Sequence, residues 1–308
     1  MFNFILCFQQ MHLSNDRTRG ITWDNLVAFN SDNCNVMKGR HNSVITKLKA
    51  KQPHIQDVGC VCHLAQLATG CGIKAMKAPV EQLLVGVYSH FDKSAKRNEL
   101  YKEFVEFTDT DKLKLLRYCS TRWLSLHTCI LRMLNQWPAL QAYFNSYEDE
   151  TSVKVRDLAG YLNDPEMKFD FLFLSAALKP LVAFNTAFQG EGVLIHKLHN
   201  EMTRLVKRYL GYILPARAIA NIPVREVSLG QEHQLKNEDL FIGAEARAFI
   251  EKEELPSVTM TKIYQTVRDF YVEAIRKMLK AFPLDSPLLQ DLDVLDPASR
   301  LDLSPETG

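Results

Sequence analysis

Three short segments in the first 130 residues carry side chains whose types and spacing could do chemistry. They contain, in chain order, Asp32 in NSDN, Cys60, Cys62 and His63 in GCVCH, and Arg122 with Trp123 in STRWLS. A carboxylate can bind a divalent metal ion, and thiols and imidazoles are zinc ligands. A guanidinium beside an indole can contact a phosphate and a base. The chain has no Walker motif, GxGxxG or GxSxG, so these segments are the candidate sites.

Asp32 follows the short apolar run Leu26 to Phe29, which favours a buried strand. Open α/β sheets place their sites at the carboxyl ends of strands, so this carboxylate occupies a suitable position. Asp is also a common turn-forming residue, and its position alone favours the turn interpretation.

The GCVCH segment suggests zinc by residue type, but its spacing is unusual. A zinc module needs a second ligand pair, and Cys119 with His127 or Cys129 is the available candidate. Small buried cysteines beside a hydrogen-bonded His63 are the simpler interpretation. A Cys–His hydrolase is disfavoured, because adjacent residues of a strand would point Cys62 and His63 to opposite faces.

Arg122 and Trp123 begin an expected helix, with Ser120 or Thr121 as its N-cap. Trp123 continues an apolar stripe through that helix, so core packing is the default interpretation of the indole. The functional alternative is a cation and an aromatic plate that contact a phosphate and a base.

These segments need elements to position them. The sequence predicts strands within 24–31 and 55–61 with a helix at 38–50 between them, which is a βαβ unit with parallel strands. We expect the next helix, which opens with Leu64, to end at Gly70 and Gly72.

Four apolar stripes at helical spacing predict further helices that face a core. Their members are Val80, Leu83, Leu84, Val87 and Phe91; Trp123, Leu126, Ile130, Leu134 and Trp137; Leu198, Met202, Leu205, Tyr209 and Tyr212; and Ile263, Val267, Phe270, Ala274 and Met278. Residues 215–240 are rich in Pro, Gly and polar side chains, which predicts a loop.

Charge and cysteine are unevenly distributed. The chain of 308 residues has a net charge of +1, but residues 1–130 hold 17 Lys/Arg against 11 Asp/Glu, and 131–308 hold 20 against 25. All seven cysteines lie within the first 129 residues. An odd number of widely spaced thiols, no signal peptide and no long apolar run favour an intracellular protein without a membrane span.

These segments, in this order, resemble the hAT-family transposases and their relatives among the BED-type and MYM-type zinc finger proteins. The similarity begins at residues 21–39, where Asp32 matches the second acidic residue of a DDE-type triad. It continues with Pro53 to Ile55, with the Cys-x-x-His motif at Cys60 and His63, and with the Arg-Trp motif at Arg122 and Trp123. Residues 188–199 and 267–283 resemble the family's helical insertion, and LDVLDP follows at 292–297.

The resemblance also predicts where the chain departs from the family. A DDE site holds two metal ions with three carboxylates, and the first should precede residue 20, where too few residues for the required strands are present. The third should follow the LDP motif, where only Glu306 is available. We therefore expect no catalysis, with Asp32 as a remnant, and no cofactor; a divalent metal would require a complete triad.

Together these patterns predict an α/β but predominantly helical chain, with an incomplete ribonuclease H-like core, a small parallel sheet and an all-helical insertion domain. The expected divisions are a disordered lead-in at 1–20, the partial core at 21–135, the insertion at 136–297 and a frayed tail at 298–308. We expect an inactive binding protein whose partners are DNA, weakly, or a second copy of itself, with no membrane and no small-molecule substrate. The location is nuclear or cytoplasmic, and the family resemblance favours the nucleus. The alternatives are an active transposase, if further chain supplies the carboxylates, and a Cys/His zinc module.

Overall fold

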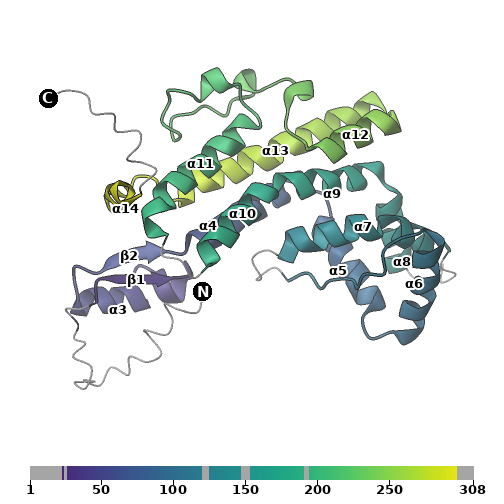
Figure 1. Ribbon diagram of the computed structural model, residues 1–308, viewed down its shortest axis with the longest axis horizontal. Helices are drawn as coiled ribbons and strands as arrows, with labels where there is room; N and C mark the ends of the chain where they lie inside the picture. The colour runs from purple at the N-terminus through teal and green to yellow at the C-terminus, as the bar shows by residue number, and fades with distance from the viewer. Residues whose placement is uncertain (1–22, 24–25, 120–124, 147–152, 191–193, 297–308) are drawn as a thin grey trace.

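The computed structural model describes residue 23 and residues 26–119, 125–146, 153–190 and 194–296. The expected lead-in at 1–20 and the tail at 298–308 therefore lie outside the described residues. Within them the chain is predominantly helical, with one small parallel sheet, as predicted (Figure 1).

The elements follow one another from a mixed N-terminal part into helices. The strands are β1 (Ala28–Ser31) and β2 (Gln56–Gly59). The α-helices are α2 (Asn35–Lys38), α3 (Val44–Lys51), α4 (Val61–Met76), α5 (Val80–Phe91), α6 (Ala95–Phe107), α7 (Ser125–Ser146), α8 (Val153–Asn163), α9 (Pro165–Ala177), α10 (Lys179–Gln189), α11 (Leu198–Gly211), α12 (Ala244–Glu253), α13 (Ser257–Ala281) and α14 (Pro287–Leu292). Short 3-10 turns are η2 (Ile195–Lys197), η3 (Ala216–Ala218), η4 (Gln231–His233), η5 (Asn237–Asp239) and η6 (Asp293–Leu295).

The βαβ unit is confirmed. Strands β1 and β2 pair in parallel, from Ala28 opposite Gln56 to Ser31 opposite Gly59, and α3 connects them. Ser43 and Thr46 form a reciprocal capping box that starts α3. This unit, β1–α2–α3–β2, is called the βαβ module below.

The βαβ module has a small apolar core of its own. Its buried members are Phe29, Ile45, Leu48 and Ile55. Both strands are shorter than predicted, because the apolar residues at the start of the first segment include the exposed Val27 and because α4 begins at Val61.

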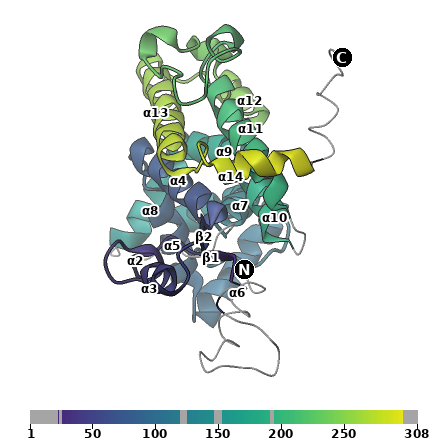
Figure 2. The same ribbon diagram turned by 90° about the vertical axis from the view of Figure 1, so that its left-hand side faces the viewer.

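Helices α4 and α13 pack along one another at the centre of the helical part (Figures 1 and 2). The predicted stop at Gly70 and Gly72 is wrong, because α4 continues through both to Met76. A side chain at Gly72 would lie 2.8 Å from the Phe270 ring and 2.9 Å from the Phe270 carbonyl oxygen. This glycine permits close approach of the two helices, and the packing outweighs its low helix propensity.

The apolar stripes face one large buried cluster, as predicted. All five residues of the stripe on α5 and all five on α13 are buried. On α7, Leu126, Ile130 and Trp137 are buried and Leu134 is half-buried, while Trp123 lies outside the described residues. The cluster extends from Val61 to Leu289, and the division predicted between 135 and 136 falls inside α7.

The predicted loop at 215–240 contains only short 3-10 turns, as expected. It is nevertheless anchored. Arg268 of α13 donates hydrogen bonds to Gln234, Leu235 and Asn237 at 2.8–2.9 Å. One backbone carbonyl and two side-chain oxygens of this loop are therefore bound to α13 by a single guanidinium.

Among the described residues no single helix is long and apolar enough to cross a membrane. The bent pair α9 and α10 together reaches the required length and composition. Most of the apolar side chains of α9 are buried in the large cluster.

The α4–α13 contact gives a stability prediction with a matched control on the same helix. Gly72→Ala should lower the free energy of unfolding by about 1–2 kcal/mol, because the added methyl group overpacks against Phe270. Gly70→Ala should raise it by roughly 0.5–1 kcal/mol, because nothing lies within 4 Å of the new methyl group and alanine is the better helix former. Urea unfolding of the three proteins measures both, and equal effects of the two substitutions would contradict the packing argument.

His90 on α5 is a buried titratable residue within an aromatic cluster. Its Nε2 lies 2.9 Å from the Tyr143 hydroxyl, and its ring contacts Phe91 and Phe144. Only 4% of the residue is exposed, and burial, with smaller contributions from Arg97 and Lys154, lowers the pKa of His90 to about 4. The folded protein therefore holds this ring neutral.

Acid should destabilise the fold through His90. Between about pH 6.5 and 4 the unfolded chain binds a proton that the folded state rejects, so stability is present above this window and falls as the pH falls through it. The expected loss is up to about 3 kcal/mol. His90→Gln keeps a polar atom for Tyr143 but cannot titrate. Its free energy of unfolding, measured from pH 7 to 4, should therefore lack the pH-dependent loss that His90 causes. An identical pH profile for both proteins would refute the assignment.

Candidate functional site

The carboxyl ends of β1 and β2 meet, as the parallel βαβ prediction required. The Cys60 amide donates to the Ser31 carbonyl at 2.9 Å, and the Asn33 side-chain amide donates to the Cys60 carbonyl at 3.0 Å. The side-chain oxygen of Asn33 occupies the space that a side chain at Gly59 would need, only 2.3 Å from the position of its Cβ. The NSDN and GCVCH segments are therefore joined side by side.

Asp32 lies directly after β1 and is exposed, so its predicted place in the fold is confirmed. Its Oδ1 accepts a long hydrogen bond of 3.4 Å from the Cys34 amide. That is the local pattern of a turn-forming Asp, which the sequence also allowed. Asp32 therefore lies at the carboxyl end of a strand and also forms a turn.

The donors near Asp32 do not fit a two-metal site. The Ser31 hydroxyl donates to the Asp32 carbonyl, and the Asn33 side-chain amide donates to the Cys60 carbonyl. Asp57 of β2 forms an ion pair with Lys38. In the part of the chain that the structure describes, no group of three His, Cys, Asp or Glu side chains could hold a metal ion. Two hard divalent cations need several shared carboxylate oxygens, and one exposed carboxylate does not supply them.

Only Gly59 of the GCVCH segment belongs to β2; its cysteines and histidine lie beyond the strand. Cys60 is the N-cap of α4, and Cys62 and His63 lie in its first turn, so the prediction that strand geometry separates these two side chains is wrong. On a helix they are successive residues, which also do not face one another. Cys62 is buried, with its thiol 3.9 Å from the Asn185 carbonyl oxygen.

The two thiols of this segment differ in acidity. A hydrogen bond with Cys62 lowers the pKa of Cys60 to about 7, against the opposing effect of burial. The same interaction, together with burial, raises the pKa of the Cys62 thiol. Cys60 is therefore the thiol of this pair that ionises first.

The suggested second zinc pair has other partners. His127 Nε2 lies 3.0 Å from the Ser175 carbonyl oxygen. The Cys129 thiol lies 3.9 Å from the Leu116 carbonyl oxygen. Cys119 is half-buried, and its carbonyl oxygen accepts a hydrogen bond from the Ser125 hydroxyl. Within the described ranges these residues do not assemble with Cys60 and His63 into a group of three metal ligands. The Arg-Trp motif, Arg122 and Trp123, lies outside the described residues.

The sequence reasoning missed an exposed basic surface on the βαβ module. Residues 26–60 contain five Lys or Arg and two Asp, a net charge of +3. Arg40, Lys47, Lys49 and Lys51 are all exposed, and none has a carboxylate within ion-pair distance among the described residues. These four residues are called the basic surface below. Charge summed over 130 residues diluted this signal, whereas counting within the predicted βαβ unit would have found it.

An aromatic ring accompanies the basic surface. Lys47 and Lys51 are one helical turn apart on α3, so they share a side of the helix. The Lys51 ammonium lies 4.7 Å from the ring centroid of Trp23, which itself packs against the small core of the module. A cation beside a partly exposed aromatic ring suits a phosphate–sugar chain.

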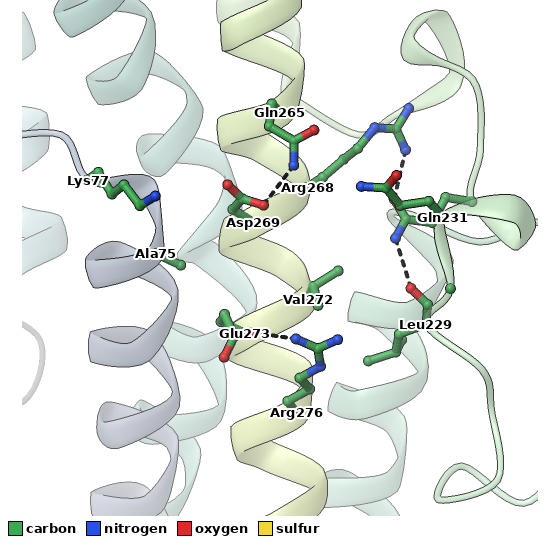
Figure 3. A pocket seen from close by; sticks show the side chains of 12 residues that line it. Ala75, Lys77, Leu229, Gln231, Gln265, Arg268, Asp269, Val272, Glu273 and Arg276 are labelled. Atoms are coloured by element: carbon green, nitrogen blue, oxygen red, sulfur yellow. Dashed lines mark hydrogen bonds and ion pairs between the residues drawn. The ribbon is translucent and has the colours of Figure 1, made fainter.

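A depression of about 420 Å³ lies between the end of α4, the side of α13 and the loop near Gly230 (Figure 3). Four of its charged residues have polar partners. Arg268 is bonded to the loop, Arg276 pairs with Glu273, and Asp269 accepts from Gln265. Lys77 also lines the depression and forms no ion pair among the described residues.

Comparison of the chain with protein-family models, with curated proteins and with solved structures finds no match.

Proposed function

We propose that this chain is a catalytically inactive relative of the hAT-family transposases that acts by binding, and that its βαβ module contacts nucleic-acid phosphates weakly. The finer fold assignment belongs to the same proposal: β1, α3, β2 and α4 are part of a ribonuclease H-like core, and the helices from α5 to α13 include the insertion. The parallel pair, with Asp32 at the end of β1 and Cys60 to His63 at the start of α4, supports this assignment.

The observation that carries the binding proposal is the basic surface. Its side chains are exposed cations without recorded carboxylate partners, so a polyanion can bind them without first breaking an ion pair. Only four cations contribute, which limits the affinity and makes it sensitive to salt. The proposed binding is therefore independent of base sequence.

The absence of catalysis is proposed from the surroundings of Asp32. Among the described residues it is a single exposed carboxylate in a turn, and the polar groups beside it are engaged with the backbone. A longer transcript that supplied two further carboxylates would convert this proposal into that of an active transposase.

Charge reversal on α3 tests the binding proposal. Lys47→Glu with Lys51→Glu should weaken binding of duplex DNA by more than tenfold at 50 mM salt and reduce the slope of log affinity against log salt by about two. Fluorescence anisotropy at several salt concentrations measures both quantities. The control Lys207→Glu with Lys252→Glu makes the same charge change at exposed positions of α11 and α12. Equal losses in both double variants, or no DNA binding at low salt, would overturn the proposal.

A nuclease assay tests the proposed inactivity. Neither the unaltered protein nor Asp32→Ala should cut plasmid DNA in the presence of Mg²⁺ or Mn²⁺, because one carboxylate cannot position two ions. A metal-dependent cut that Asp32→Ala abolishes would establish catalysis and favour the active transposase instead. This assay is independent of the binding measurement.

A further inference from the structure

His199 on α11 connects three parts of the C-terminal region. Its Nδ1 lies 2.9 Å from Asp293 Oδ2 in η6, and its Nε2 lies 3.0 Å from the Leu284 carbonyl oxygen, which follows α13. Residues 284–296, called the C-terminal arm below, are thereby held to α11 at both ends. In both views α14, the helix of this arm, lies above the two-stranded sheet (Figures 1 and 2).

The two contacts of His199 determine how many protons the pair must hold. A backbone carbonyl can only accept, so Nε2 donates. An ionised carboxylate also only accepts, so Nδ1 must donate as well, and the ring then carries both protons. If the proton is instead on Asp293, the count is the same. The docked arrangement needs one proton more than a neutral imidazole beside a carboxylate.

Among the described residues, the Asp293 carboxylate has no side-chain partner other than His199. Its Oδ1 is buried and has no hydrogen-bond partner within the described residues, so the stabilisation of its charge depends on His199. If His199 loses its charge, the buried Oδ1 of this half-buried carboxylate is left with an uncompensated desolvation penalty.

Other charged groups on the packed elements have partners of their own or lie in solvent. Lys197 of η2 lies 3.9 Å from Asp296, and Asp285 of the arm pairs with Arg225 at 2.7 Å. On α11 itself, Glu201 pairs with Arg204. Asp291 of α14 is exposed, and His196 of η2, half-buried, is the other titratable ring nearby in sequence.

We infer that docking of the C-terminal arm on α11 is proton-dependent, with the His199–Asp293 pair as a pH-sensitive clamp. Relative to a neutral imidazole beside a carboxylate, docking takes up one proton, so it is favoured at lower pH and weakens as the pH rises. The loss is at most tenfold in the docking equilibrium per pH unit, because one proton is linked. The buried Leu284 and Leu289 hold the arm independently of pH, so the clamp modulates docking rather than creating it.

Two asparagine variants distinguish this clamp from other effects of pH. Asp293→Asn places an amide where the carboxylate was, and its N–H₂ can donate to Nδ1 of a neutral ring whose Nε2–H still donates to Leu284. Docking in this variant should no longer depend on pH. Asp285→Asn is the matched control, because it removes another carboxylate of the same arm whose partner is an arginine that stays charged.

Hydrogen exchange of the arm, measured by mass spectrometry from pH 6 to 8.5 and expressed as protection factors corrected for intrinsic exchange, reads out docking. Protection in the unaltered protein and in Asp285→Asn should fall across this range as the pH rises, by up to tenfold per pH unit. Asp293→Asn should give a flat profile, whether protected or not. A flat profile in the unaltered protein, or a parallel fall in Asp293→Asn, would overturn the inference and assign any pH effect to other groups such as His196.

Discussion

The rest of the structure depends on the close contact between α4 and α13. Gly72 has no side chain, so the Phe270 ring and backbone reach the surface of α4. Helix α4 starts at the end of β2, and α13 anchors the loop at 215–240 through Arg268. One packed pair therefore connects the βαβ module at the start of the chain to the helical part near its end, across about 200 residues of sequence.

Periodicity in the sequence was sufficient to predict most elements of this fold. The stripes on α5, α7, α11 and α13 and the parallel strands follow from spacing alone, because each element buries one face. The stop at Gly70 and Gly72 was wrong because the helix packing that Gly72 permits outweighs a helix-propensity cost of about 1 kcal/mol per glycine. The second strand was expected to reach Val61, but it ends at Gly59 because α4 begins at Val61.

The candidate site was predictable in position but not in composition. Asp32 follows β1 and Cys60 follows β2, and the two lie close together because parallel strands bring their carboxyl ends together. The partners of each side chain depend on distant parts of the chain, such as Asn185 beside Cys62, and sequence spacing contains no information on them. The basic surface was overlooked because charge was summed over 130 residues and not over the predicted βαβ unit.

The module and the helical part have separate apolar cores of very different size. Four buried residues stabilise the module, whereas the helical part has a cluster that extends from Val61 to Leu289. A core this small supports a low-energy opening transition, so backbone amides of β1 and α3 should exchange with solvent without global unfolding. A ligand that binds only the closed module would then repress this opening, and occupancy of the basic surface would be coupled to local folding.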